Sequence, residues 1–283
     1  MIDDTSIAEA LARYRADGYA VLRRVFDADE IADMGEAFAR HWAEGMAHGR
    51  SFRHGNLLYR LGHDAKLGKL VRLVQWPSYG DPVLEAVRRD PRYLAILEPL
   101  IGRDIKQIIN QLHWKPPGAA GAEFAFHQDV RFRRPRSAYR NLATSYVQTG
   151  IAIDAQRAAN GAMRIYPGSH RLGEQDLAGP APVLDQSMAE ERLVAAGLDP
   201  AKLVVLELDP GDVALWHVHT IHGSGPNLTP GDRRFYLNGY VRAADCDRGE
   251  WAFRDGAPCP LGEPVLVHYE ALHSRPGPHY LDE

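Results

Sequence analysis

The apolar positions in the first hundred residues recur mostly at the three- and four-residue spacing of amphipathic helices. Asp4 or Thr5 is a suitable N-cap for the first helix, and Asp27 with Glu30 forms a capping box for the second. An Asp-Pro pair precedes each of the next two helices. Residues 50–80 mix Arg, His and Gly without a clear period, so we expect irregular structure there. The expected elements of this mostly helical part are helices at about 5–16, 28–45, 82–89 and 91–101 and a short strand at 19–25.

From Ile105 onward, short apolar runs separated by Gly, Pro, Asn and Asp replace the helical pattern. The arginine-rich residues 131–140 should form an exposed loop, and the chain from Cys246 shows little regular pattern. Helices followed by many short strands indicate one α+β domain with a mainly β core, a sandwich or a barrel. The expected strands are 105–114, 124–130, 146–153, 162–166, 203–208, 213–219 and 234–241, with a short helix at about 187–196.

Composition narrows the class of protein. With 283 residues, 45% apolar and 25% charged, the chain resembles ordinary globular proteins. A net charge of −4 gives no basic surface for nucleic acid, and no apolar run approaches the roughly 20 residues of a membrane helix. The first residues are acidic and lack the apolar core of a signal peptide. Cys246 and Cys259 do not form a metal or disulfide pattern, so we expect reduced thiols and a cytoplasmic location.

The strongest candidate for chemistry is His127-Gln128-Asp129, at the end of a predicted strand. Side chains two apart on an extended strand point to the same face, so an imidazole and a carboxylate would lie together. These are two of the three ligands of a 2-His-1-carboxylate set, which leaves positions open on Fe(II). The plainer alternative is a solvated His and Asp at a strand end. An unpaired carboxylate is costly to bury among apolar neighbours, which favours the metal.

The third ligand must come from elsewhere in the chain, and His222 is favoured over His219. On an extended strand His217 and His219 would share one face and His222 would lie on the other. Gly-Ser-Gly follows His222 and lets the backbone turn closely around a metal. His217 and His219 are then interpreted as hydrogen-bonded, partly buried histidines or as support for the ligands.

Several basic and polar residues are candidates for binding a cosubstrate or substrate. Arg233 follows the third ligand by eleven residues and suggests a cationic anchor for an acidic cosubstrate. Arg234 is adjacent, so alternation should send one arginine inward and the other toward solvent. Gln111, His113 and Lys115 alternate onto one face of the strand before the first ligand, where they are candidates for contact with either molecule.

Several short motifs occur in a specific order: Lys115–Gly118 and His127–Asp129, then Ile151–Asp154, Asn160-Gly161 and Pro167–His170, then Pro210–Asp212, His222–Asn227 and Arg233. Together they resemble the phytanoyl-CoA dioxygenase family of Fe(II)- and 2-oxoglutarate-dependent oxygenases, over roughly residues 15–245. The resemblance implies a double-stranded β-helix (jelly roll, cupin-like) with supporting N-terminal helices. It also implies one domain over residues 1–283, with a helical lead-in to about 104, a jelly-roll core over about 105–245 and an irregular tail.

The resemblance further implies roles for single residues. His127, Asp129 and His222 would hold Fe(II), Arg233 would pair with the 5-carboxylate of 2-oxoglutarate, and Ser224 would add a hydroxyl to it. The implied reaction consumes O₂ and 2-oxoglutarate, hydroxylates an unactivated C–H bond and yields succinate and CO₂. In related halogenating enzymes a small residue replaces the carboxylate, so Asp129 predicts oxygenation rather than chlorination.

One departure and two alternatives accompany this interpretation. Gln148-Thr149-Gly150 stands where the family often has an aromatic residue beside the cosubstrate. A cupin-like metal protein without O₂ chemistry would keep the fold, but it would not need Arg233. A non-catalytic jelly-roll binding domain would not need the three ligands. The substrate is expected to be a small molecule, and the arginines of residues 131–140 suggest a lid for an anionic one.

Overall fold

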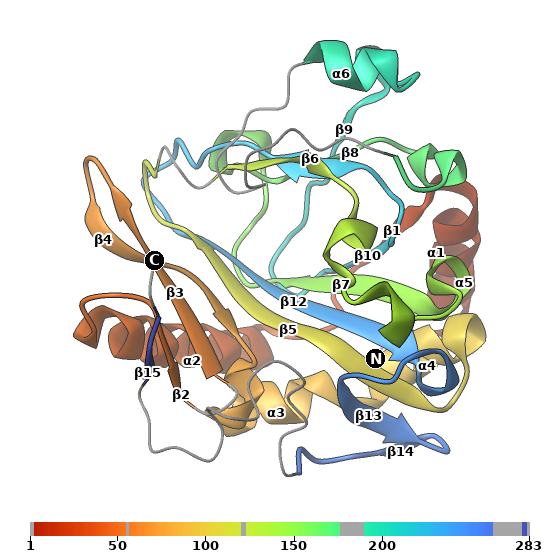
Figure 1. The fold of residues 1–283 in the computed structure, drawn as a ribbon, viewed down its shortest axis with the longest axis horizontal. Helices are drawn as coiled ribbons and strands as arrows, with labels where there is room; N and C mark the ends of the chain where they lie inside the picture. The colour runs from red at the N-terminus through yellow and green to blue at the C-terminus, as the bar shows by residue number, and fades with distance from the viewer. Residues whose placement is uncertain (1–2, 55–56, 120–122, 176–189, 263–278, 282–283) are drawn as a thin grey trace.

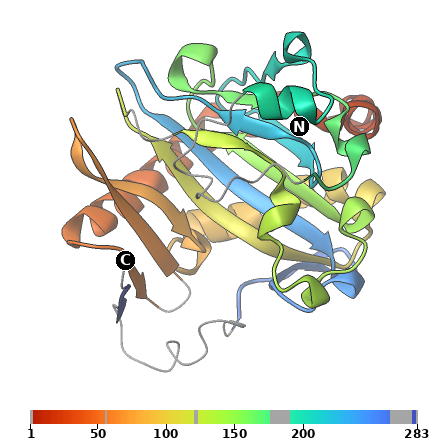
Figure 2. The ribbon, with the colours of Figure 1, turned by 45° about the horizontal axis from the view of Figure 1, so that its top comes forward.

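Two antiparallel sheets form the centre of the protein, and most of the helices cover the outer face of the larger sheet (Figure 1). The computed structural model describes residues 3–54, 57–119, 123–175, 190–262 and 279–281. The smaller sheet packs across the inner face of the larger one (Figure 2). This arrangement confirms the predicted α+β jelly-roll fold with supporting N-terminal helices.

The N-terminal helices follow the amphipathic pattern of the sequence. They are α1 (Asp4–Asp17), α2 (Ala28–Ala47), α3 (Pro82–Arg88) and α4 (Pro91–Ile101). Asp3, and not Asp4 or Thr5, caps α1, because its side chain accepts a hydrogen bond from the backbone N–H of Ser6. The predicted capping box of α2 is confirmed. The four helices and the outer face of the larger sheet share one apolar core. Among the described residues, no helix combines the length and the apolar character of a membrane span.

The larger sheet contains the predicted central strands and several additional ones. Its strands in spatial order are β1 (Tyr19–Leu22), β10 (Val213–His217), β7 (Tyr146–Ala152), β12 (Arg233–Arg242), β5 (Ile105–Lys115), β4 (Gly68–Gln75), β3 (Leu57–Asp64), β2 (Phe52–His54) and β15 (His279–Tyr280). The prediction of irregular structure over residues 50–80 was therefore wrong for most of that range. Both faces of β3 and β4 are partly buried, which removes the polar–apolar alternation that would have indicated strands.

The smaller sheet is built from very short strands. These are β6 (Phe124–His127), β11 (His222–Ser224), β8 (Met163–Ile165) and β9 (Val204–Val205), in that spatial order. The predicted strand 203–208 shortens to two residues, and the predicted strand 213–219 ends at His217. Apolar side chains from both sheets, including Met163, Trp216 and Phe235, pack together between them. Two short helices, α5 (Leu142–Ser145) and α6 (Glu190–Ala195), lie in the connections; residues 187–189 of the predicted helix fall outside the described residues.

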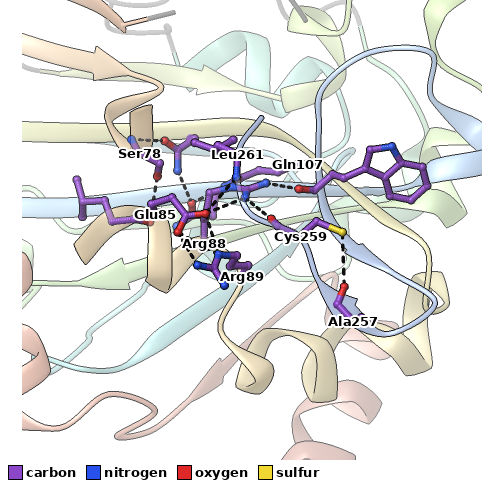
Figure 3. Close-up of polar contacts among 12 residues, drawn as sticks. Ser78, Glu85, Arg88, Arg89, Gln107, Ala257, Cys259 and Leu261 are labelled. Carbon is purple, nitrogen blue, oxygen red and sulfur yellow. Dashed lines mark hydrogen bonds and ion pairs between the residues drawn. The ribbon is translucent and has the colours of Figure 1, made fainter. Parts of the chain in front are cut away.

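The tail beyond Cys246 is more regular than the sequence indicated. β13 (Glu250–Arg254) pairs with β5 and with β14 (Ala257–Pro258). The fully buried Arg88 of α3 holds this segment, because its guanidinium donates hydrogen bonds to the carbonyl oxygens of Trp251 and Cys259 and to the side chain of Gln107 (Figure 3). The tail is therefore fixed by polar contacts with a distant helix, which local sequence patterns do not reveal.

Candidate metal and cosubstrate site

The two histidines and the aspartate predicted as metal ligands come together between the sheets. His127 ends β6 and His222 begins β11, and the two residues are paired across the sheet. Nε2 of His127 lies 3.8 Å from Oδ1 of Asp129, and Nε2 of His222 lies 4.0 Å from Oδ2 of Asp129. All three ligand atoms lie within 4.8 Å of one another. Donor atoms that each lie about 2 Å from one ion are roughly 3–4 Å apart, so the spacing suits a single metal ion.

Hydrogen bonds at Nδ1 fix the orientation of both imidazoles. Nδ1 of His127 lies 2.7 Å from the carbonyl oxygen of Ala125, and Nδ1 of His222 lies 3.0 Å from that of Thr220. A carbonyl oxygen only accepts, so Nδ1 carries the proton and Nε2 keeps its lone pair toward Asp129. Burial also lowers the pKa of His127 to about 4, which favours the neutral, ligating form. These donors fit Fe(II), and a three-ligand set leaves positions open for other molecules.

A tryptophan that the sequence did not identify orients the carboxylate. Nε1 of Trp216, on β10 of the larger sheet, donates a hydrogen bond of 2.8 Å to Oδ2 of Asp129. Burial alone would raise the pKa of Asp129, but the nearby His222 and Arg133 and this hydrogen bond bring it below its usual value. Asp129 therefore stays ionised in a buried position. No sequence signal marked Trp216, because its apolar surroundings are those of any core residue.

Two local expectations around the ligands were wrong in detail. β6 ends at His127, and Asp129 begins a 3₁₀ turn that continues to Phe132. The two side chains still share a face because the intervening Gln128 keeps an extended backbone. His217 and His222 do not share a strand: β10 ends at His217, and His222 lies in the other sheet. His219 lies in the turn between them and is not part of the metal-ligand cluster.

The close approach of β11 to β6 depends on Gly223. A Cβ added to Gly223 would lie 2.9 Å from the carbonyl oxygen of Phe124 and 3.1 Å from the backbone nitrogen of Phe126. Any side chain would therefore separate the two strands that carry His127 and His222. The glycine after His222 was expected to let the backbone turn closely around a metal, and the close approach that it allows is to the neighbouring strand β6.

The ligand cluster opens into a cavity of about 710 Å³ between the two sheets. Arg233 is buried at its wall, where burial lowers the pKa of the guanidinium to about 10. Its Nε has no hydrogen-bond partner, and no ion pair to Arg233 occurs among the described residues. A buried cation without a counter-ion fits an anionic ligand, and its planar fork matches a carboxylate. The distal carboxylate of 2-oxoglutarate is such a group.

Arg234 points to the opposite face of β12, as alternation predicted. It is partly exposed to solvent, and its guanidinium also forms an ion pair with Asp154 at 2.8 Å. Its Nε and backbone N–H also donate to the same carboxylate. Arg234 is therefore a structural cation with a complete partner, whereas Arg233 has none.

Lys115 and Ser224 lie behind Arg233. Lys115 faces Arg233 across the β5–β12 pair, and its Nζ donates a 2.6 Å hydrogen bond to Oγ of Ser224. Burial, and then the charge of Arg233, lower the pKa of Lys115 to about 6. Nζ also contacts the carbonyl oxygens of Gly225 and Gly161, and the two N–H groups of an uncharged amine suffice for the two short contacts, to Ser224 and Gly225, whereas the Gly161 contact is long at 3.4 Å. Because Ser224 accepts from Lys115, its own hydroxyl proton is free for a ligand.

The remaining polar candidates also line the cavity. Gln111 and His113 share the cavity face of β5, and Nε2 of His113 lies 3.0 Å from Oε1 of Gln111. Burial and the charges of Arg233 and Lys115 lower the pKa of His113 to about 3. His113 is therefore a neutral hydrogen-bonding group. It lies outside the metal-ligand cluster.

An aromatic ring from β12, that of Phe235, lies against β7 at Gly150. A Cβ added to Gly150 would lie 2.2 Å from Cζ of Phe235, so the ring covers Gly150 directly. The neighbouring Gln148 also lines the cavity. Where residues 148–150 depart from the family pattern, an aromatic side chain from β12 therefore lies nearby. The sequence did not indicate this contact, because Gly150 and Phe235 are far apart in the chain.

Residues 131–140, here called the arginine loop, are only partly exposed. The prediction of an exposed loop fails for Arg133, which is 5% exposed and donates a 2.9 Å hydrogen bond to the hydroxyl of Tyr146. Its Nε has no partner. The loop begins at the 3₁₀ turn that carries Asp129, which places its first residues at the cavity.

Comparison with known proteins agrees with this geometry. The chain is 29% identical over 244 residues to a probable alpha-ketoglutarate-dependent hypophosphite dioxygenase of Stutzerimonas stutzeri, which covers 83% of this chain and 79% of that protein. It is 23% identical over 247 residues to the ectoine dioxygenase of Bordetella parapertussis, covering 81% and 73% of the two chains. These names agree with the predicted class of enzyme and with 2-oxoglutarate as the cosubstrate.

Solved structures show the same fold. The structure of EctD from S. alaskensis with 2-oxoglutarate and 5-hydroxyectoine has a TM-score of 0.65 at 23% identity, covering 96% of this chain and 88% of that chain. The epimerase SnoN in complex with Fe³⁺, alpha ketoglutarate and nogalamycin RO has a TM-score of 0.59 at 24% identity, covering 92% and 98%. The family model described as phytanoyl-CoA dioxygenase matches residues 14–235. The chain therefore belongs to the phytanoyl-CoA dioxygenase family, as its motifs predicted.

Proposed function

We propose that this protein is an Fe(II)- and 2-oxoglutarate-dependent oxygenase that hydroxylates an unactivated C–H bond of a small molecule. One observation supports this most: the ligands His127, Asp129 and His222 open onto the same cavity as a buried, unpaired Arg233. Iron with 2-oxoglutarate and O₂ supplies the oxidising chemistry, in which the cosubstrate is converted to succinate and CO₂. The protein positions the reacting C–H bond and excludes water.

In this proposal each residue has a distinct task. The three ligands hold iron, and Trp216 fixes the orientation of the Asp129 carboxylate. Arg233 binds the 5-carboxylate of 2-oxoglutarate in a buried site, where a guanidinium–carboxylate pair is strong because little water screens it. Ser224 donates its free hydroxyl proton to the same carboxylate.

Three further polar residues complete the cosubstrate site. Lys115 holds the Ser224 hydroxyl from behind, through the hydrogen bond that its Nζ donates. Gln111 and His113 contribute neutral hydrogen-bonding groups to the cavity wall. These groups add no charge to the site, so the cosubstrate depends on Arg233 for its counter-ion.

The substrate in this proposal is a small, acidic molecule rather than a neutral one. Arginines line the cavity, whereas Asp129 is the one acidic residue among its described lining residues. Hypophosphite, named for the Stutzerimonas relative, is itself an anion, but it offers P–H bonds and no C–H bond. Organic acids are therefore tested first, with hypophosphite beside them, by whether each stimulates succinate formation.

The extent and location of the catalytic unit are also proposed. We infer one catalytic domain over residues 1–283, since helices α1–α4 share a core with the larger sheet. We infer a cytoplasmic location, which agrees with the free thiols of Cys246 and Cys259.

Variants of the ligands test the proposal against its alternatives. Protein reconstituted with Fe(II) should convert 2-oxoglutarate to succinate, and His127→Ala or Asp129→Ala should abolish this turnover while leaving a cooperative thermal melt. His219→Ala is the matched control, because His219 lies outside the cluster, and it should retain turnover. Unchanged turnover in either ligand variant contradicts the assignment. A folded protein that binds metal but never consumes 2-oxoglutarate supports a cupin-like metal protein instead, and one that binds no metal supports a non-catalytic domain.

A further inference from the structure

Two arginines of the arginine loop point away from the cavity and have acidic partners. Arg136 forms an ion pair with Glu174, and Arg140 forms one with Asp247. Neither arginine lines the cavity. Exposed pairs of this kind are common on protein surfaces and contribute little to stability. The charges of these two arginines are therefore already paired without a ligand.

The other three arginines of the loop line the cavity and differ in their partners. Arg248, from the segment before β13, joins them there. Within the part of the chain that the structure describes, none of the four has a carboxylate in an ion pair. Their hydrogen bonds go to backbone carbonyl oxygens and to the Tyr146 hydroxyl. This arginine cluster consists of Arg131, Arg133, Arg134 and Arg248.

Arg133 shows most clearly that the cluster is built for a ligand. Its side chain is buried, yet Nε has no hydrogen-bond partner. Its guanidinium lies 4.9 Å from the centre of the Tyr146 ring, and the nearby Asp129 stabilises its charge without forming an ion pair. A buried guanidinium N–H without an acceptor is costly. The oxyanion of a ligand would supply that acceptor.

The charge of the cavity remains positive after the cofactors bind. Fe(II) and the dianion 2-oxoglutarate carry equal and opposite charges. Together they therefore leave the net charge of the cavity unchanged. Asp129 is the one carboxylate among the described residues that line the cavity, against five arginines including Arg233. A positive cavity attracts anions and disfavours cations.

We propose that the arginine cluster recognises an oxyanion group of the substrate, of the carboxylate or phosphonate type, and that the substrate is an organic acid with an apolar body. A guanidinium fork matches either oxyanion. Leu73, Ile108 and Phe132 provide apolar surface in the same cavity, whose volume of about 710 Å³ exceeds what a lone oxyanion needs. This inference rests on the proposed function, because it assigns the second occupant of the iron site.

The test measures which small molecules the iron- and 2-oxoglutarate-loaded protein retains without O₂. The probe is a mixture of matched pairs: alkyl and aryl carboxylic acids with their primary amides, and phosphonic acids with their neutral dimethyl esters. Equilibrium dialysis followed by mass spectrometry gives the retention of each compound. Wild-type protein should retain at least one acid about tenfold more than its neutral partner, since a charge-assisted hydrogen bond accounts for a factor of this order.

Paired substitutions on the same loop provide the control. Arg131→Gln with Arg248→Gln should lower acid retention about tenfold and leave neutral compounds unchanged. Arg136→Gln with Arg140→Gln removes the same charge from the outer side and should change nothing. Equal retention of acids and neutral partners by the wild type, retention of no acid at all, or equal losses in the two double variants would each overturn the proposal. Retention of carboxylates or of phosphonates alone would identify the oxyanion.

A separate measurement distinguishes failure of this inference from failure of the proposed function. Each protein is first examined for the absorption band that Fe(II) and 2-oxoglutarate produce together. Wild-type protein without the band contradicts the proposed function, whatever compounds it retains. Wild-type protein with the band but without a preference for acids overturns the role of the arginine cluster alone.

Discussion

Replacing Arg233 by methionine should have opposite effects on the stability of the ligand-free protein and on its affinity for 2-oxoglutarate. Arg233 is buried at the cavity wall, and its guanidinium has no acidic partner among the described residues. In the free protein this charge opposes folding. With cosubstrate bound, the same charge should hold a carboxylate. Methionine keeps much of the aliphatic volume and removes the charge.

The size of each effect follows from the structure. Burial lowers the pKa of Arg233 from 12.5 to about 10. At about 1.4 kcal/mol per pKa unit, the buried charge opposes folding by roughly 3 kcal/mol, so the free energy of unfolding of the ligand-free variant should rise by about 1–3 kcal/mol. Loss of a charge-assisted hydrogen bond of about 1.5–3 kcal/mol should raise the Kd for 2-oxoglutarate about 10- to 100-fold.

Urea unfolding of metal-free protein and anaerobic titration of Fe(II)-loaded protein with 2-oxoglutarate measure the two effects. Arg234→Met is the matched control on the neighbouring residue. It leaves Asp154 without its cation, so it should lose about 1 kcal/mol of stability and keep its affinity. A destabilised Arg233→Met variant with unchanged affinity refutes the reasoning, and equal losses of affinity in both variants show that the wrong arginine was chosen.

Two further substitutions probe the supporting residues. Trp216→Phe removes the hydrogen-bond donor to Asp129 and should weaken Fe(II) binding or turnover about 10- to 100-fold. Metal titration and succinate release measure the two effects. Unchanged binding and turnover would show that the hydrogen bond is dispensable. Lys115→Met should flatten the pH dependence of stability. The pKa of Lys115 is about 6 in the folded protein, against 10.5 for a fully solvated lysine, so between these values the unfolded chain binds more protons and stability rises with pH. Urea melts at pH 6.5, 8 and 9.5 give the free energy of unfolding at each pH. It should rise with pH more steeply in the wild type than in Lys115→Met, by up to about 1.4 kcal/mol per pH unit. Equal slopes in the two proteins would contradict an uncharged buried amine.

Local sequence patterns predicted the elements that have a helical period or an uninterrupted strand-like run. The amphipathic helices were identified because one face packs on the core, and the central strands β5, β7 and β12 were identified as strand-like runs bounded by turn residues. β3 and β4 were missed because charged residues, His and Gly interrupt their apolar residues. β13 was missed because its position depends on Arg88, more than 160 residues away, which no local pattern reports.

In the site too, local patterns predicted some residues, and those that depend on distant partners were missed. The ordered motifs predicted the residues that form the metal-ligand cluster, because the spacing of His127 and Asp129 is a local property and His222 belongs to a separate motif of the same ordered set. Trp216 and Phe235 were not identified, since each acts only through a partner from a different strand, Asp129 or Gly150. The sequence showed the charge of the arginine loop but did not indicate which arginines face inward, because that depends on the acids Glu174 and Asp247 on the outer side.

Anaerobic absorption of the metal-free protein, titrated with Fe(II) and then with 2-oxoglutarate, tests the iron and cosubstrate assignment most directly. We predict a metal-to-ligand charge-transfer band that requires both additions, because His127, Asp129 and His222 leave positions open for a chelating cosubstrate. The band should be absent in His222→Ala and present in His219→Ala. A folded wild-type protein that binds Zn²⁺ yet shows no band after both additions would contradict the assignment.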